Sequence, residues 1–328
     1  MDKKDMQKYF DEDIVDAERI NHLGNNVLYR VQLSSGSRLL KVYSQLHAQN
    51  WPRAETEFSA VEYLWQKGFR NIPQPFQLHK KDHVAVYSFE NGRVLKPEEV
   101  TERDVLEISD FVVRLHSLDA SGFPPASAAA LKLEDYATDI ESRIKNLVAQ
   151  CALEGTMEDG TRFLHDEVVP LANRLVREFR GRYSPKELSK EFPLWQQRLN
   201  VGDFGIHNVL DTCGRKVFLD FEYFGRDDPV RELLGFVHHD KHIAIGRELK
   251  RIFVDSYIEA TKAPEEMRQR MHNADALKGM TFVLIYLNVL REQYQKQLRA
   301  QGADVDKIAK ERIDKARRKL EDLTFFQD

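Results

Sequence analysis

The chain has 328 residues, of which 42% are apolar and 31% are charged, and its formal net charge at pH 7 is −4. This composition excludes a disordered chain and is typical of a globular protein with one large or two modest cores. The slight negative charge gives no general attraction to nucleic acid or to an anionic membrane.

The cysteines and the chain start favour a protein that is not exported. The two cysteines, Cys151 and Cys213, stand without a partner motif, so the sequence predicts neither a disulfide framework nor a zinc site. Residues 1–5 are charged and lead into no apolar segment, which argues against a secretion signal. The longest apolar run, 282–287, is far below the roughly 20 residues of a membrane-spanning helix. We therefore expect a cytoplasmic protein without a membrane span.

The first hundred residues predict a small β-rich lobe with one helix. Strands are expected at 27–33 and 38–43, with a turn-forming sequence between them. A helix is expected over 53–67, because its apolar residues recur at three- and four-residue steps. Two prolines then break the helix, and 84–89 is predicted to be a further strand.

The rest of the chain predicts a larger, mainly helical lobe. Helices are expected at 105–115, 133–150 and 161–180, the last two joined by a polar loop at 154–160. A long apolar helix is expected over 274–299, and a charged helix with a solvated face over 304–322.

Four histidines in this part of the chain have non-catalytic interpretations. His116 ends an apolar helical face, and we expect it to be a packed structural residue. His238 and His242 are one helical turn apart and His239 lies between them, but no third ligand stands at a telling spacing. We therefore expect surface or groove histidines there.

Asp203, Asn208 and Asp220 are the candidate catalytic and metal-binding residues. Asp203 precedes Asn208 by five residues, and short strands at 209–210 and 217–219 lead through a turn to Asp220. Magnesium prefers oxygen ligands, which Asn208 and Asp220 offer. Asp203 would orient an acceptor hydroxyl and take its proton late in the reaction. The spacing therefore predicts phosphoryl transfer from a magnesium nucleotide.

This segment resembles the loops of the aminoglycoside phosphotransferase and choline kinase family, a group of small-molecule kinases. The usual pattern is His-Gly-Asp, four residues, Asn, then Asp-Trp/Phe-Glu followed by Gly-Asp-Pro. Here Gly202-Asp203, Asn208, Asp220-Phe221-Glu222 and Asp228-Pro229 match in order and spacing. The customary His is replaced by Val201, which we expect to change the support of the loop rather than its chemistry. The stretch 203–229 more particularly resembles a bacterial branch of this group.

The resemblance implies an α+β, bilobal, protein-kinase-like fold. It places a nucleotide-binding lobe at residues 1–92 and a catalytic and acceptor-binding lobe at 93–328. It also implies ATP or GTP as phosphoryl donor and Mg²⁺ as cofactor, with Asp203 as base and Asn208 and Asp220 as metal ligands.

Further nucleotide-binding residues follow from the resemblance alone. Lys41 matches the family's strand lysine for the α- and β-phosphates. Glu57 matches its helix partner, with Glu55 as the alternative. The turn 21–26 resembles the phosphate loop, and the hinge follows the strand at 84–89. The residues that these two segments contribute are Gly24, Asn25, Asn26, Phe89 and Glu90.

The acceptor stays open between a sugar, an amino alcohol, a cell-envelope precursor and an aminoglycoside. Glu232 stands where the family often has a further Asp, and either anchors the catalytic loop or is an ordinary exposed glutamate. A catalytically silent nucleotide-binding or scaffold protein is the alternative to an enzyme. A protein kinase is disfavoured, because the sequence lacks an Ala-Pro-Glu signature and a long activation segment.

Overall fold

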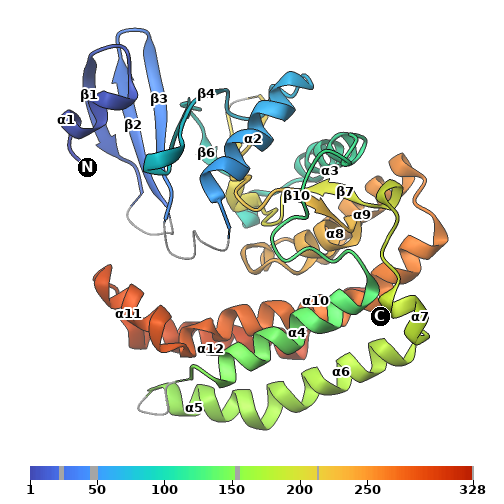
Figure 1. Ribbon diagram of the computed structural model, residues 1–328. Helices are drawn as coiled ribbons and strands as arrows, with labels where there is room; N and C mark the ends of the chain where they lie inside the picture. Colours follow the sequence, from blue (N-terminus) through green and yellow to red (C-terminus); the bar gives the residue numbers. More distant parts are fainter. Residues whose placement is uncertain (22–25, 45–50, 152–155, 213, 327–328) are drawn as a thin grey trace.

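The protein has two lobes, a smaller one built on a sheet and a larger one built mainly of helices (Figure 1). The structure, a computed structural model, describes residues 1–21, 26–44, 51–151, 156–212 and 214–326. The α+β architecture with two lobes expected from the sequence is confirmed.

The smaller lobe contains a five-stranded antiparallel sheet in the order β1-β2-β3-β5-β4. Its expected hairpin is present, with Leu33 opposite Gly36 across a two-residue turn. The first strand, β1, was not predicted, because only Ile14 of its six residues is buried and no apolar alternation marks it. The strands are β1 (Ile14–Arg19), β2 (Val27–Leu33), β3 (Gly36–Val42), β4 (Pro75–His79) and β5 (Val84–Ser88).

The two faces of this sheet have different partners, as the alternation of side chains along β5 requires. Val84 and Val86 belong to a cluster with Met6 and Tyr9 of the N-terminal segment, which contains α1 (Lys3–Met6). Ala85 and Tyr87 belong to the large core instead, together with the buried face of α2. Helix α2 (Arg53–Gln66) contributes Ala60, Val61 and Leu64 to that core.

The larger lobe combines ten helices of the described residues with two small sheets. The sheets are β6-β8-β9 and β7-β10, built from β6 (Arg93–Val94), β7 (Arg198–Asn200), β8 (Val209–Asp211), β9 (Lys216–Phe218) and β10 (Gly225–Asp227). The helices are α3 (Glu102–His116), α4 (Leu133–Val148), α5 (Thr156–Phe163), α6 (Val169–Gly181), α7 (Pro185–Ser189), α8 (Pro229–His238), α9 (Arg247–Thr261), α10 (Glu265–Tyr286), α11 (Glu292–Ala300) and α12 (Val305–Glu321). In Figure 1, α4, α6, α10 and α12 run along the lower side of the molecule.

Three helix predictions in the larger lobe need correction. The loop expected at 154–160 is helical from Thr156, and α5 continues through a π-helical segment into α6. The helix expected at 274–299 breaks where a 3-10 turn follows Tyr286 and Arg291 is extended. Helix α12 buries an alanine- and isoleucine-bearing face and contacts α10, so it is not simply solvated. No helix in the described part of the chain is apolar over enough length to cross a membrane.

An aromatic cluster joins α3 to the segments that carry the sequence motif. The Phe111 ring of α3 stacks on Phe218 of β9 with 3.9 Å between centroids. It also contacts Phe204, at 6.1 Å, and Phe221, at 6.4 Å. These two phenylalanines directly follow Asp203 and Asp220, so core packing sets where the motif residues stand.

Candidate functional site

A cavity of about 400 Å³ lies between the five-stranded sheet of the smaller lobe and the β8–β9 hairpin of the larger lobe. Side chains from both lobes line it, including most of the residues predicted to bind nucleotide and metal. These are Asn26, Lys41, Glu57, Phe89, Glu90, Asn208 and Asp220. Two further predicted residues, Gly24 and Asn25, lie outside the described residues.

Lys41 bridges two carboxylates inside this cavity. Its Nζ lies 2.6 Å from Glu57 Oε2 and 2.7 Å from Asp220 Oδ1. Burial alone would lower the pKa of Lys41, but the carboxylates of Asp220 and Glu57 outweigh it and raise that pKa. Burial raises the pKa of Glu57 against the opposing effect of Lys41. The alternative partner, Glu55, lies 3.6 Å from Lys80 instead, so the expected pairing of Lys41 with Glu57 is the one present.

Asn26, the residue directly before β2, is joined to the segment after Asp220. Its Nδ2 donates to Glu222 Oε2 at 2.7 Å, and its Oδ1 accepts from the backbone N–H of Ser44 at 3.1 Å. Arg53 lies 3.6 Å from the other Glu222 oxygen. Asn26 is therefore held at the edge of the cavity by groups of both lobes.

The side chains of Phe89 and Glu90, the predicted hinge residues, contact other groups of the protein. Glu90 accepts hydrogen bonds from Ser88 Oγ at 2.6 Å and from Arg215 Nη2 at 3.0 Å. The guanidinium of Arg30 lies 5.0 Å from the centre of the Phe89 ring. Both side chains therefore have protein contacts at this edge of the cavity.

The loop after β7 carries both Asp203 and Asn208. Gly202 has a φ of +90°, and a Cβ there would lie 2.7 Å from Tyr223 Cβ. The close approach of the loop to Tyr223 therefore requires glycine at this position. Asn208 Nδ2 donates to the backbone carbonyl of Asp203 at 3.1 Å, which leaves its side-chain oxygen available. Asp220 has a φ of 67°, a left-handed conformation that is uncommon for a residue other than glycine and is concentrated at functional sites.

Residues of α8 and the turn after it support this loop. Glu232 accepts from the backbone N–H groups of Val201 at 3.2 Å and Gly202 at 3.4 Å, so its expected anchoring role is present. His242 Nε2 accepts from the Ile206 N–H at 2.8 Å.

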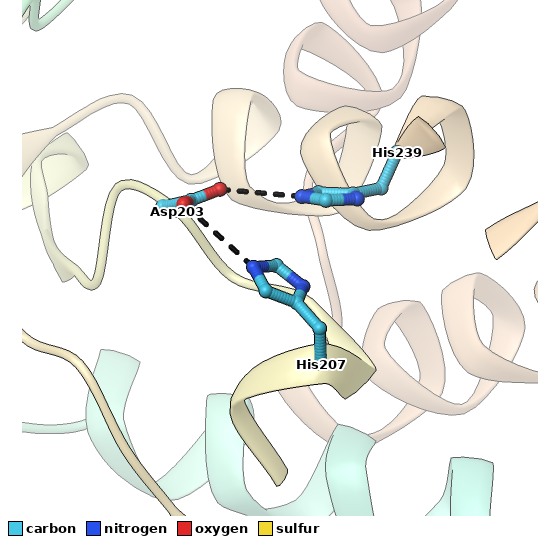
Figure 2. A group of neighbouring side chains, drawn as sticks. All are labelled: Asp203, His207 and His239. Atoms are coloured by element: carbon cyan, nitrogen blue, oxygen red, sulfur yellow. Dashed lines mark hydrogen bonds and ion pairs between the residues drawn. The ribbon is translucent and has the colours of Figure 1, made fainter. Parts of the chain in front are cut away.

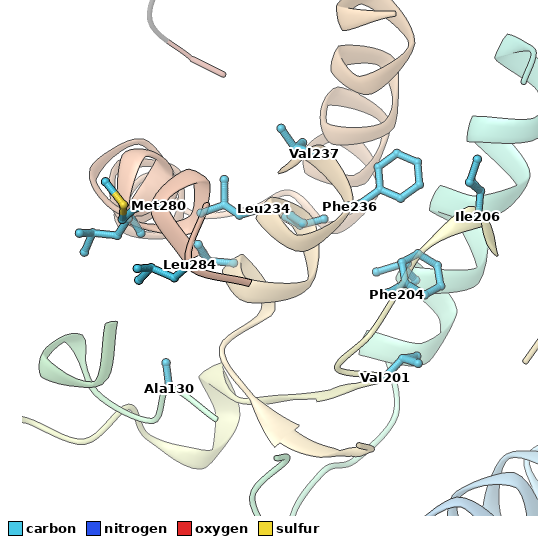
Figure 3. Close-up of a cluster of buried hydrophobic side chains, with 14 of the residues drawn as sticks. Ala130, Val201, Phe204, Ile206, Leu234, Phe236, Val237, Met280 and Leu284 are labelled. Atoms are coloured by element: carbon cyan, nitrogen blue, oxygen red, sulfur yellow. The ribbon is translucent and has the colours of Figure 1, made fainter. Parts of the chain in front are cut away.

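His242 also has a defined protonation state. Its Nδ1 donates to the Phe236 carbonyl at 2.6 Å, while Nε2 accepts from the loop. Burial lowers the pKa of His242 well below its usual value, in keeping with a neutral ring. The rings of Phe236 and Phe204 lie 6.3 Å apart between centroids, and Figure 3 shows both in the apolar cluster that also contains Val201 and Ile206.

Two histidines flank the carboxylate of Asp203 (Figure 2). His239 Nε2 lies 3.2 Å from Oδ1, and His207 Nε2 lies 3.8 Å from Oδ2. Burial would raise the pKa of Asp203, but His207 and His239 outweigh this effect and lower it well below its usual range. The carboxylate is therefore ionised at neutral pH, and 43% of the side chain is exposed.

The expectation of surface or groove histidines at 238, 239 and 242 is wrong. Each is at most 6% exposed, and two of them contact the Asp203 loop. His116 is buried as expected and bonds to Tyr257 at 2.8 Å. The sequence carries no local signal for the contact between His239 and Asp203, whereas His207 stands within the motif itself.

Two groups of described side chains offer enough ligand atoms for a cation. They are Asp203 with His207 and His239, and Asp220 with Glu57 and Glu222. Asn208 lines the same cavity as Glu57 and Asp220, so its side-chain oxygen is a further candidate ligand. An amide oxygen and carboxylates are the ligands that magnesium prefers, so the residues around Asp220 fit that ion.

Solved structures that resemble the chain include a spectinomycin phosphotransferase and choline kinases. A spectinomycin phosphotransferase solved with ADP and spectinomycin shares 14% identity, with 96% of each chain covered and a TM-score of 0.63. A choline/ethanolamine kinase family protein from Mesorhizobium loti shares 18% identity, with 93% of this chain and 88% of that chain covered and a TM-score of 0.60. The choline kinase LicA from Streptococcus pneumoniae shares 14% identity over 98% of this chain and 97% of that one, with a TM-score of 0.60. The protein-kinase-like fold is therefore confirmed.

Comparisons of sequence give a family but no individual relative. No curated protein matches the chain. The model of the phosphotransferase enzyme family matches residues 16–271, which is more than half of the chain and includes Lys41, Asp203 and Asp220. The chain belongs to the phosphotransferase enzyme family.

Proposed function

We propose that the protein transfers the γ-phosphoryl group of ATP or GTP to a hydroxyl group of a small molecule. The observation that carries the proposal is the convergence of Lys41, Asn208 and Asp220 on one cavity, with Asp203 on the adjoining loop. Similar structures that were solved with ADP and with AMP support a nucleotide donor.

The donor side of the reaction depends on charge neutralisation. Lys41, oriented by Glu57, would hold the phosphates with its ammonium group. Asn208 and Asp220 would hold Mg²⁺ through their side-chain oxygens, and Asn26 would contribute to the loop that covers the phosphates. When bound, the ion neutralises the charge that develops on the transferred group. Phe89 and Glu90 would flank the base through their backbone.

Asp203 would act on the acceptor side as a base that is already ionised. Its carboxylate orients the acceptor hydroxyl, and the hydroxyl oxygen forms the new bond to the γ-phosphorus. The bond from that phosphorus to the bridging oxygen breaks, and the nucleoside diphosphate leaves with the electron pair. The hydroxyl proton passes to Asp203 late in the step.

The acceptor is proposed only as a class. A sugar, an amino alcohol and a cell-envelope precursor carry suitable hydroxyl groups, as does an aminoglycoside. We assign the nucleotide to a lobe of residues 1–92 and the acceptor to a lobe of residues 93–328, in keeping with the position of the cavity between the sheet and the β8–β9 hairpin.

The first test is a thermal shift with ATP and with GTP, each measured with and without Mg²⁺. A magnesium-dependent rise in Tm is expected for the wild type. Asp220→Ala should remove most of that rise, because it removes a metal ligand. The absence of any shift with either nucleotide would favour a catalytically silent protein.

The second test measures release of nucleoside diphosphate in a screen of hydroxyl-bearing metabolites. Asp203→Ala should lower turnover by roughly 10²- to 10⁴-fold and leave nucleotide binding intact. Asp110→Ala, which changes an exposed aspartate of α3, is the matched control. Full activity of Asp203→Ala on the true acceptor would show the assignment to be wrong.

A further inference from the structure

His239 is a buried residue outside the sequence motif that contacts Asp203. It begins the turn after α8, 36 residues after Asp203, and only 6% of it is exposed. Its ring lies 4.9 Å from that of His242 and 5.4 Å from that of Phe282, measured between centroids. Packing on both partners restricts the orientation of the ring.

A backbone contact indicates which nitrogen of His239 carries the proton. The N–H of Lys241 donates to His239 Nδ1 at 3.1 Å, so Nδ1 presents a lone pair. A neutral imidazole with an accepting Nδ1 carries its proton on Nε2. Nε2 faces Asp203 Oδ1 at 3.2 Å, and it is therefore the donor in that contact.

The same arrangement argues against His239 as a metal ligand, although Asp203, His207 and His239 stand close enough to surround an ion. A histidine that binds a metal through Nε2 donates its other N–H to an acceptor. The Nδ1 of His239 meets the Lys241 N–H, which is a donor.

We propose that His239 is a positioning residue for phosphoryl transfer, holding Oδ1 of Asp203 so that Oδ2 is directed to the acceptor hydroxyl. This inference rests on the function proposed above. Oδ2 lies 3.8 Å from His207 Nε2, which is longer than a hydrogen bond, so its lone pairs are available for the hydroxyl. The proton of His239 stays on Nε2 throughout, and the hydroxyl proton goes to Asp203.

Two substitutions separate this role from a purely structural one. His239→Asn retains an acceptor for the Lys241 N–H, because a short side-chain carbonyl caps such a turn, but its amide does not extend to Asp203. His239→Gln places an amide N–H near the position of Nε2 and loses the cap. The Asn variant therefore keeps the structural contact, and the Gln variant keeps the donor.

The kinetic readout is release of ADP from Mg·ATP with water as the acceptor. His239→Asn should lower kcat by roughly 10- to 100-fold and change the KM for ATP by less than about twofold, because misplacement of a catalytic group affects the chemical step. His239→Gln should stay within about fivefold of the wild-type kcat. Retained kcat in the Asn variant, or equal losses in both variants, would overturn the proposal.

A second readout does not depend on catalysis. In ¹⁵N-histidine-labelled protein, with the His239 signals assigned from their loss in His239→Gln, His239 should be the neutral Nε2–H form. An unprotonated Nε2 would overturn the inference. A wild type that releases no ADP and gives no thermal shift with nucleotide would instead refute the proposed function, with the tautomer still decided by the spectrum.

Discussion

Asn26 and Glu222 are 196 residues apart in the sequence, and a hydrogen bond of 2.7 Å joins the amide of the first to the carboxylate of the second. The bond joins the residue directly before β2 to the segment that follows Asp220. We expect Asn26→Ala and Glu222→Ala each to destabilise the protein, and the pair to show a coupling energy of about 1 to 2 kcal/mol, as hydrogen bonds to charged groups do. A double-mutant cycle of urea unfolding measures this coupling, and additive effects would contradict it.

Lys41→Met should destabilise the protein by about 3 kcal/mol or more, because it leaves the buried carboxylate of Glu57 and the partly buried carboxylate of Asp220 without their cation. Adding Glu57→Gln should recover part of this loss, since it removes one unpaired charge. Unfolding in urea measures both values. Lys8→Met is the control, because Lys8 pairs with Asp82 at the surface and its replacement should leave the unfolding midpoint close to that of the wild type. A double variant less stable than Lys41→Met would refute the explanation.

Gly205→Ala should leave the fold intact and impair turnover. A Cβ at Gly205 would lie 2.6 Å from His207 Nδ1 and 3.2 Å from His239 Nε2, so both rings must move. Because these rings flank Asp203, we expect kcat to fall by roughly tenfold or more while Tm changes by only a few degrees. Gly122→Ala is the matched control, since a Cβ there meets no atom within 4 Å. Unchanged kcat in Gly205→Ala would mean that the rings tolerate the displacement.

His238→Gln should change how stability depends on pH. Burial lowers the pKa of His238 to about 4, and Lys319 Nζ donates to its Nδ1 at 2.9 Å, so the folded ring stays neutral. The unfolded residue takes up a proton below its ordinary value of about 6.5. The stabilisation that His238 provides relative to the variant is therefore complete above that value and lost as the pH falls.

The expected loss is about 1.4 kcal/mol per pH unit between about pH 6.5 and pH 4. Urea unfolding of both proteins from pH 5 to pH 8 measures it, with the plateau above pH 7 as the internal reference. A stability difference that is constant across this range would contradict the buried neutral state.

The ion pair of Lys41 with Glu57 could be predicted because it follows from local patterns and a family match. Lys41 lies in a strand segment of otherwise apolar residues, and Glu57 shares a buried helix face with Val61 and Leu64. The loop and hairpin that carry Asp203, Asn208 and Asp220 are also short-range features.

Contacts that depend on tertiary packing could not be predicted. His239 reaches Asp203 only because the chain turns back after α8, and no periodicity describes a residue beyond a helix end. The break after α10 was not predicted, because Leu287, Val289 and Leu290 of the 3-10 turn are as buried as the helix before them. Strand β1 was not predicted for the opposite reason, because it is mostly exposed.

The aromatic cluster around Phe111 has a consequence for heat inactivation. Phe204 and Phe221, the neighbours of the proposed base and of a proposed metal ligand, both contact this ring within the main core. The distance between the carboxylates of Asp203 and Asp220 can then change only if the core itself loosens. Activity and tertiary structure should accordingly disappear over the same range of temperature, with no inactive but still folded protein between them.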